Sequence, residues 1–170
     1  MKELYDAIRT IPDFPKKGIM FRDITPLIKN EILFTKTIDL FTKQVPPDIT
    51  KIVAIESRGF IFGGALACKL KKGFVPIRKF GKLPCETIRH TYALEYGQDT
   101  IEIAADAFEP NEKVVLVDDV LATGGTAAAA CCLIEKAGAK VKKMLFLIEL
   151  KDLGGRKKIN RYEIYSILNI

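Results

Sequence analysis

The chain has 170 residues, of which 48% are hydrophobic and 28% are charged. This length most simply makes one domain, residues 1–170, with room for a substantial core, and the composition is that of a globular protein. No apolar run approaches the roughly 18 residues of a membrane helix, and the amino end carries no secretory pattern. We therefore expect a cytoplasmic protein that does not insert into a membrane.

The formal net charge is +6. An excess of positive charge suits a nucleic-acid ligand, and it equally suits a substrate that carries several phosphates. The densest basic stretch has no interleaved aromatic residues, which favours a solvated face over a surface for stacked bases. It consists of Arg156, Lys157, Lys158 and Arg161.

The four cysteines form no CxxC pair, so their spacing predicts neither a zinc site nor a disulfide framework. Cys68, Cys131 and Cys132 lie in helical patterns and are expected to be small core or interface residues.

The amino-terminal part combines a short helix with a proline-rich segment. Residues 2–10 space their apolar side chains as a helix does, and this helix stops before Pro12. Residues 12–26 contain three prolines and one glycine, so they cannot form a long helix or a central strand. We expect an ordered loop that packs its apolar side chains on another surface, such as a flat ligand. These side chains are Phe14, Ile19, Met20 and Phe21.

The rest of the chain alternates helices and strands. Asn30 caps a helix that runs to about Val45, and Gly138 closes a later helix at residues 126–137. A further helix is expected at residues 60–70, and buried strands are expected at 51–55, 74–77, 113–117 and 141–148. Such alternation implies an α/β fold, with a central, mainly parallel sheet flanked by helices.

Residues 78–104 interrupt the alternation. The stretch opens with basic residues, glycine and proline, and it continues as two short strands joined at residues 97–99. An excursion of this kind from an α/β core often forms a lid over a site. We expect a flexible two-stranded lid here.

The clearest chemical signal is VVLVDDVLATGGT at residues 114–126. Asp118 and Asp119 follow a buried strand, at the edge where open α/β sheets bind ligands. The next small and hydroxylated residues open a helix, and their backbone N–H groups suit a phosphate. They are Ala122, Thr123, Gly124, Gly125 and Thr126. Because two acids would repel a bare phosphate, we expect a sugar phosphate with Mg²⁺; the alternative is an ordinary turn with an acidic tip.

Five segments, in order, resemble the type I phosphoribosyltransferases, and more closely the members that take adenine. They read FPKKGIMFRDITPL, ESRGFIFG, RKFGKLP with TYALEYG, VDDVLATGGT and LIELKDLGGRKKI. The resemblance spans essentially the whole chain. It implies the fold of that family, with residues 1–30 as a small hood and residues 78–104 as the lid. The implied sugar phosphate is 5-phosphoribosyl 1-diphosphate (PRPP).

The resemblance also implies how PRPP is bound. Its ribose would contact Asp118 and Asp119, and its 5-phosphate would contact residues 122–126, the phosphate loop. Its diphosphate would contact a loop of backbone N–H groups and two cations. These residues are Ser57, Arg58, Gly59, Arg78 and Lys82. Mg²⁺ would arrive on the diphosphate, so no dedicated protein ligands are expected.

The base and the lid receive roles in the same way. The purine would lie between Phe21 and Leu150, and backbone groups near Met20 and Arg58 would read its edge. Arg22 is expected in the same substrate site. Glu95 would handle the proton when the lid closes over Tyr96.

The expected activity joins adenine to PRPP, giving AMP and diphosphate, with Glu95, Arg78 and Lys82 as the catalytic residues. Family members that act on 6-oxopurines carry an acid inside the phosphate loop, where this chain has Ala122. Members are usually homodimers, and the apolar segment 60–62 is a candidate interface. Cys85 and the single histidine, His90, lie in the lid and are expected to be incidental.

Two other functions remain possible. One is a PRPP-sensing regulator that binds nucleic acid, because this fold also occurs in repressors and attenuators. The absence of an added helix-turn-helix module and the acid in the lid argue against it. The other is the same transfer to a different purine, such as xanthine, guanine or hypoxanthine.

Overall fold

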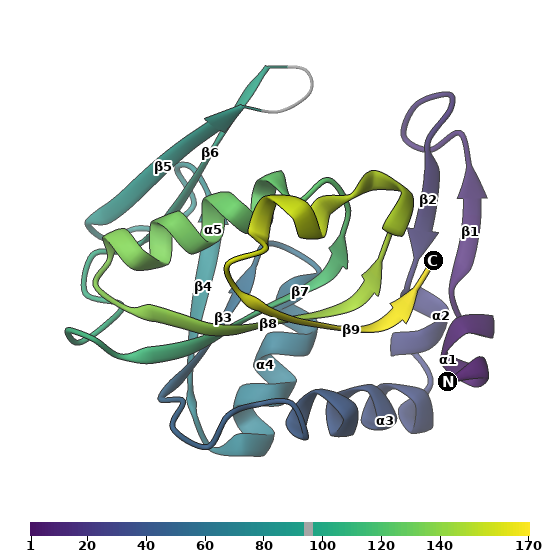
Figure 1. Ribbon diagram of the computed structural model, residues 1–170, viewed down its shortest axis with the longest axis horizontal. Coiled ribbons are helices and arrows are strands. Elements are labelled where there is room, and N and C mark those ends of the chain that lie inside the picture. The colour runs from purple at the N-terminus through teal and green to yellow at the C-terminus, as the bar shows by residue number, and fades with distance from the viewer. Residues whose placement is uncertain (94–96) are drawn as a thin grey trace.

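The computed structural model describes residues 1–93 and 97–170, which form a seven-stranded sheet with a separate two-stranded sheet beside it (Figure 1). The helices are α1 (Lys2–Asp6), α2 (Thr25–Ile28), α3 (Glu31–Thr42), α4 (Gly59–Leu70) and α5 (Gly125–Lys136), with 3₁₀ helices η1 (Lys151–Leu153) and η2 (Gly155–Ile159). The strands are β1 (Arg9–Pro12), β2 (Met20–Asp23), β3 (Lys51–Ile55), β4 (Gly73–Lys79), β5 (Thr87–Ala93), β6 (Gln98–Ala104), β7 (Lys113–Leu121), β8 (Lys140–Glu149) and β9 (Glu163–Asn169). Within the described ranges, none of the helices is long and apolar enough to cross a membrane.

Five neighbouring strands of the main sheet, in the order β4-β3-β7-β8-β9, run parallel. β6 extends the sheet by pairing antiparallel with the end of β4, at Arg78 and Lys79, and β5 pairs with β6 along its length. The predicted α/β fold with a central, mainly parallel sheet flanked by helices is confirmed, and β5 and β6 form a hairpin in the lid as predicted. The base of this hairpin is therefore part of the sheet itself. Gln98 and Asp99, which were expected in the joining turn, belong to β6 and pair with Ala93 and Tyr92.

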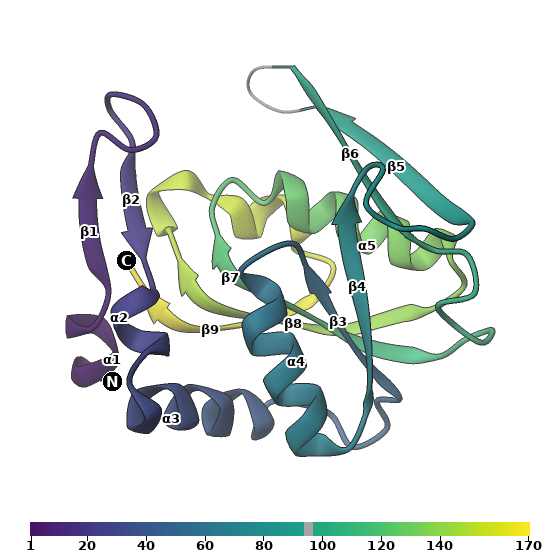
Figure 2. The ribbon, with the colours of Figure 1, turned by 180° about the vertical axis from the view of Figure 1, so that it is seen from behind.

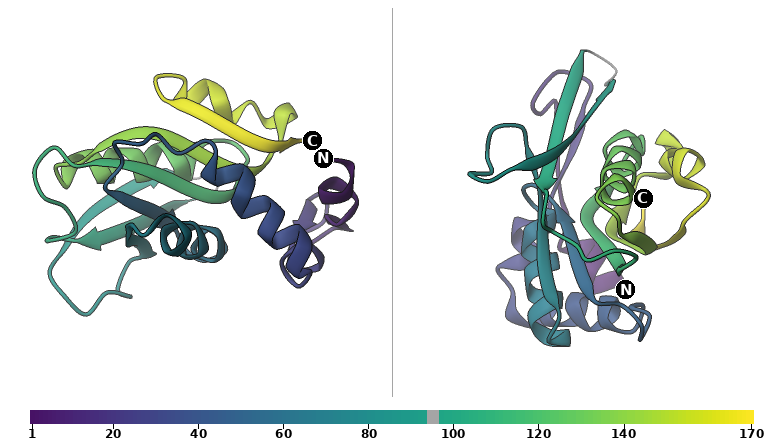
Figure 3. Two further views of the ribbon diagram at one scale, coloured as in Figure 1. Left: turned by 90° about the horizontal axis from the view of Figure 1, so that it is seen from below. Right: turned by 90° about the vertical axis from the view of Figure 1, so that its left-hand side faces the viewer.

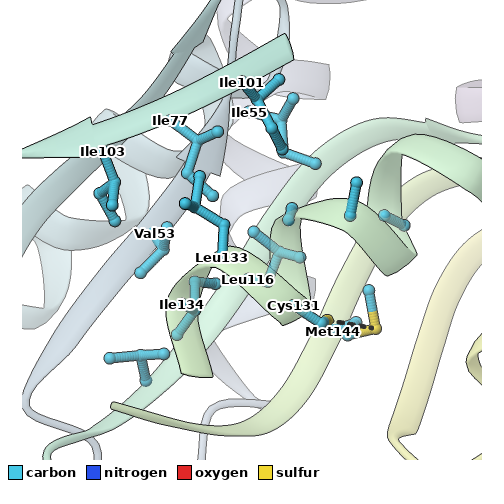
Figure 4. Close-up of a cluster of buried hydrophobic side chains, with 14 of the residues drawn as sticks. Val53, Ile55, Ile77, Ile101, Ile103, Leu116, Cys131, Leu133, Ile134 and Met144 are labelled. Carbon is cyan, nitrogen blue, oxygen red and sulfur yellow. Dashed lines mark hydrogen bonds between the residues drawn. The ribbon is translucent and has the colours of Figure 1, made fainter. Parts of the chain in front are cut away.

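Helices cover both faces of the sheet. α5 and the 3₁₀ helices lie on one face, while α4 and α3 lie on the other (Figures 2 and 3). Successive residues of β3 point to opposite faces, so Val53 joins the cluster under α5 and Ile52 joins the cluster under α4. Figure 4 shows Leu133 and Ile134 of α5 in the first cluster. These two cores hold the strand ends, where the polar residues lie, in fixed positions.

The amino-terminal segment differs from the prediction. α1 ends at Asp6 instead of continuing to Thr10, and the chain then forms β1, which pairs antiparallel with β2. The expected loop is therefore partly a hairpin. Pro12 is tolerated because it ends a strand of an isolated pair, where a missing N–H costs little. Arg9 and Asp23 join the two strands through an ion pair of 2.5 Å.

Other boundaries also differ from the prediction. α3 starts after Asn30, whose side chain accepts N–H bonds from the next turn as predicted, but it ends at Thr42 rather than Val45. β7 continues to Leu121 because its pairing with β8 continues past the two acids. No strand is predicted at residues 163–169, where β9 forms an edge of the sheet.

The cysteines are free thiols in different environments. Cys131 is buried, with its Sγ 3.8 Å from the Met144 Sδ (Figure 4), as expected for a core residue. Cys132 is half-buried. Cys68 on α4 and Cys85 just before β5 are exposed, so Cys68 does not belong to the core.

Candidate active site

A cleft of about 400 Å³ lies beyond the carboxyl ends of β3, β4 and β7. Open α/β sheets bind their ligands at this edge, because the loops there connect strands to the amino ends of helices. Three segments line the cleft, at residues 55–58, 77–79 and 118–127, and Ile101 of β6 lines it as well. Most of the residues predicted to bind PRPP are therefore brought together. The cleft-lining members of that set are Ser57, Arg58, Arg78, Asp118, Asp119, Ala122, Thr123, Gly124, Gly125 and Thr126.

The two acids form a close pair in this cleft. The backbone N–H of Asp119 donates to the Asp118 Oδ1 at 2.9 Å. The side chain of Asp119 is buried, and the Arg58 Nε lies 2.8 Å from its Oδ2. This contact is an ion pair without hydrogen-bond geometry, and within the described residues the Oδ2 accepts no hydrogen bond. A ligand hydroxyl would reach this buried oxygen only after Arg58 moved aside.

Burial also changes the protonation of the pair. Loss of solvation raises the pKa of Asp118 well above its ordinary value, and the neighbouring charge of Asp119 raises it further. Burial raises the pKa of Asp119 too, although the Arg58 guanidinium opposes that shift. Donors from a ligand, or a cation bound to it, would favour the ionised form of both acids.

The phosphate loop, residues 122–126, lies between β7 and α5. Gly124 has a φ of +78°, a conformation that favours glycine, and α5 begins at the next residue without a side-chain cap. The first N–H groups of this helix are therefore open to an anion, which the helix dipole also favours. On the lid strand β5, the Tyr92 hydroxyl donates to the Thr126 Oγ1 at 3.3 Å.

Gly155, at the start of η2, supports the phosphate loop from behind. A Cβ at Gly155 would lie 2.1 Å from the Ala122 carbonyl oxygen and 2.8 Å from the Gly124 nitrogen. A Cβ at Gly124 would in turn lie 2.4 Å from the Gly155 carbonyl oxygen. The two backbones touch directly, so the shape of the loop depends on glycine at both positions.

The predicted diphosphate loop, residues 57–59, leads into α4. Ser57 is exposed and Arg58 is half-buried, while Gly59 is buried against the acid pair. A Cβ at Gly59 would lie 2.8 Å from the Asp118 Oδ1, so glycine allows α4 to approach β7. The amino end of α4 therefore lies beside the acid pair and near that of α5, although the Phe60 and Ile61 N–H groups already donate to the Ser57 and Arg58 carbonyls.

The cations at the end of β4 are held by a residue that the sequence analysis does not single out. Glu56 accepts hydrogen bonds from the Arg78 Nε at 3.0 Å and from the Lys82 Nζ at 2.9 Å. It also accepts the backbone N–H of Lys79 at 2.9 Å. Burial alone would raise the pKa of Glu56, but these three bonds outweigh it and lower the pKa to about 2. Lys82 does not line the cleft and reaches its edge through Glu56.

Apart from Arg58, the residues predicted to hold the purine lie outside this cleft. Phe21 on β2 stacks under the Arg58 guanidinium, with 4.8 Å from the Arg58 Cζ to the ring centre. The Arg58 Nη1 donates to the Arg22 carbonyl at 3.1 Å, so the hairpin is tied to the diphosphate loop. Met20 is exposed, and Leu150 is half-buried just after β8. Glu95 and Tyr96 lie outside the described residues.

Comparisons with known proteins agree with this arrangement. Residues 28–169 match the model of the phosphoribosyl transferase domain. The fold and the cleft thus define a phosphoribosyltransferase. An adenine phosphoribosyltransferase of Pelodictyon phaeoclathratiforme is 55% identical over 165 residues, covering 94% of this chain and 93% of that protein.

Solved structures point to the same group. The crystal structure of adenine phosphoribosyltransferase from Thermoanaerobacter pseudethanolicus matches with a TM-score of 0.96 and 48% identity, over 99% of each chain. The enzyme from Saccharomyces cerevisiae, solved with an imino-altritol bisphosphate and adenine, matches with a TM-score of 0.92 and 44% identity, over 98% of this chain and 97% of that chain. The chain belongs to the adenine phosphoribosyltransferase family.

Proposed function

We propose that the protein transfers the 5-phosphoribosyl group of PRPP to N9 of adenine, giving AMP and diphosphate, as a step of purine salvage. The observation that carries the proposal is the acid pair Asp118–Asp119, placed in one cleft with the open amino end of α5. A carboxylate pair suits the two ribose hydroxyls, and the helix end suits the 5-phosphate. Family membership supports the choice of adenine.

In the proposed reaction the bond from C1 of the ribose to the diphosphate breaks, and a bond from C1 to N9 of adenine forms. Positive charge builds on the sugar, as in glycoside hydrolysis, while negative charge builds on the leaving diphosphate. Arg78, Lys82 and the N–H groups at residues 57–59 would stabilise that negative charge. Glu95 would accept the proton from N9, which could contribute roughly 10²–10⁴-fold to the rate.

We propose that Mg²⁺ enters as part of the substrate, bound to the diphosphate of PRPP, where it neutralises charge on the leaving group. The donor set fits this arrangement. Mg²⁺ is usually held by substrate phosphates, waters and one or two carboxylates, and the cleft offers one carboxylate pair, Asp118 and Asp119. These two residues would hold the ribose and orient its Mg²⁺-bearing end.

We propose that Phe21 and Leu150 sandwich the base, with Met20 and Arg22 beside it. The contact of Phe21 with Arg58 supports this role, because it places an aromatic face next to the diphosphate loop. The hood would be residues 1–30, and the lid residues 78–104 would exclude water when Tyr96 closes over the site.

We also propose that the protein is a homodimer and cytoplasmic. Phe60 and Ile61 are partly exposed and available for an interface, but Phe62 is fully buried against Phe34 and Phe41. Only two residues of the predicted interface segment 60–62, Phe60 and Ile61, are therefore accessible to a second subunit. Light scattering on the purified protein measures the number of subunits. A monomer at the concentrations used in the activity assay would refute the homodimer.

The test is AMP formation from labelled adenine, PRPP and Mg²⁺, with hypoxanthine, guanine and xanthine as competing bases. We expect adenine to react and the 6-oxopurines to compete poorly. Rapid turnover of hypoxanthine would assign the enzyme to another purine. No AMP, together with salt-sensitive binding to RNA or DNA, would favour the PRPP-sensing regulator, with which the net charge of +6 is compatible.

A further inference from the structure

Glu56 lies between the end of β3 and the start of α4 and has no part in the roles given above. Its side chain is 12% exposed, although it is a carboxylate at the edge of an anion-binding cleft. A buried negative charge beside a site for diphosphate is costly on electrostatic grounds, so its presence needs a reason. The reason lies in its partners, Arg78 and Lys82, which are both expected to meet the diphosphate.

We propose that Glu56 is a positioning residue, which orients Arg78 and Lys82 for the leaving diphosphate of PRPP. This inference rests on the proposed function. Arg78 uses its Nε for Glu56, and within the described part of the chain its two terminal nitrogens donate no hydrogen bond. Its Cζ lies 5.9 Å from the centre of the Phe60 ring. The hydrogen bond to Glu56 fixes the Nε edge of the guanidinium, and the Phe60 ring lies against its face. Its two terminal nitrogens are therefore available to donate to a phosphate.

The two cations are held differently. The side chain of Arg78 is 31% exposed, whereas that of Lys82 is 51% exposed. An exposed ion pair is worth roughly 0–1 kcal/mol, so Lys82 can leave Glu56 for a ligand at small cost. Arg78 stays bonded through its Nε while its other donors bind. Glu56 therefore keeps two like charges close together before PRPP arrives and releases one of them afterwards.

The charge of Glu56 has opposite effects on binding and on turnover. It repels the diphosphate of bound PRPP, but it also holds Arg78, and brings Lys82 close, where negative charge grows in the transition state. Its loss should therefore leave the KM for PRPP nearly unchanged, because the two effects offset each other in the ground state. Turnover should fall, because the attraction of two well-placed cations for the growing negative charge exceeds the repulsion from the single Glu56 carboxylate.

The experiment compares Glu56→Gln and Glu56→Asp with the parent enzyme in the AMP-forming assay. We expect Glu56→Gln to lower kcat about 10–100-fold, the range for a residue that orients the groups in direct contact with the substrate, with the KM for PRPP within threefold. Glu56→Asp keeps the charge and should recover part of the loss. Glu112→Gln is the matched control, because Glu112 is also a mostly buried carboxylate, paired with Lys51 outside the cleft. It should keep the kcat of the parent.

A double-mutant cycle separates positioning from a general structural role. If Glu56 acts through Arg78 and Lys82, adding Glu56→Gln to the Arg78→Met, Lys82→Met variant should change kcat less than twofold. A further tenfold loss in that background, or an unchanged kcat for Glu56→Gln alone, would overturn the inference while the parent still made AMP. A parent enzyme that made no AMP would instead overturn the proposed function, and this inference with it.

Discussion

Replacing Gly155 with alanine should damage PRPP binding although Gly155 lies outside the cleft lining. The new Cβ would lie 2.1 Å from the Ala122 carbonyl oxygen, and real Cβ atoms essentially never come within 3.0 Å of another heavy atom. Relief needs a movement of about 1 Å, and both neighbours are backbone, so no side chain can turn away. Overpacking of this kind costs roughly 1–3 kcal/mol of stability, and a 1 Å displacement in a site can cost about 10²-fold in rate.

The displaced group is the phosphate loop, so the loss should be specific to PRPP. We expect kcat/KM for PRPP to fall about 100-fold in Gly155→Ala, while the KM for adenine stays within threefold. Steady-state kinetics with each substrate varied in turn measures both. Gly64→Ala is the matched control, because a Cβ there meets nothing within 4 Å and α4 should gain roughly 0.5–1 kcal/mol. Wild-type kinetics for a folded Gly155→Ala enzyme would refute the reasoning.

The other predictions concern the acid pair and the lid. Because the folded protein raises the pKa of Asp118, its ionised form costs stability at neutral pH, so Asp118→Asn should raise Tm, by about 2–4 °C per kcal/mol, while abolishing PRPP binding. A lower Tm in a melting experiment would contradict this. For the same reason PRPP binding should release protons and weaken as pH falls, by up to about tenfold per unit, and calorimetry in buffers of different ionisation enthalpy would detect the protons. Glu95→Gln should lower kcat far more than PRPP affinity, and unchanged turnover at saturating substrates would remove Glu95 from the mechanism. Tyr92→Phe should raise the KM for PRPP about two- to tenfold, as expected for loss of the contacts of its hydroxyl with Thr126 and Asp99; a wild-type KM would show that these contacts are not used.

The parts of the fold that were predicted correctly rest on local patterns. The apolar run before Asp118 indicates a strand buried on both faces, and Asn30 indicates the start of a helix, because each signal lies within a few neighbouring residues. The amino-terminal hairpin was missed because β1 is stable only when paired with β2. β9 has apolar β-branched residues that could have revealed it, but it follows the basic stretch that was interpreted as a solvated face.

The site also contains residues that local sequence patterns predict and residues that they do not. The acid pair and its glycine-rich turn are adjacent in sequence, so their chemistry can be predicted from the residues alone. Glu56 meets Arg78 and Lys82 across 22 and 26 residues, and Gly155 meets the phosphate loop through bare backbone. Such contacts between residues far apart in the sequence cannot be predicted from the spacing of residue types. The roles of Phe21 and Leu150 come from the family resemblance and stay predictions.

Cys85 is an exposed thiol in the lid and can be labelled with a fluorescent dye. Cys131 is buried, and burial raises the pKa of its thiol to about 12, so maleimides should leave it unmodified. Cys68 and Cys85 are exposed, and Cys85 alone belongs to the lid. Cys132 is half-buried and must be replaced as well. In a Cys68→Ser, Cys132→Ser background, a fluorophore on Cys85 would therefore track closure in solution, one enzyme molecule at a time.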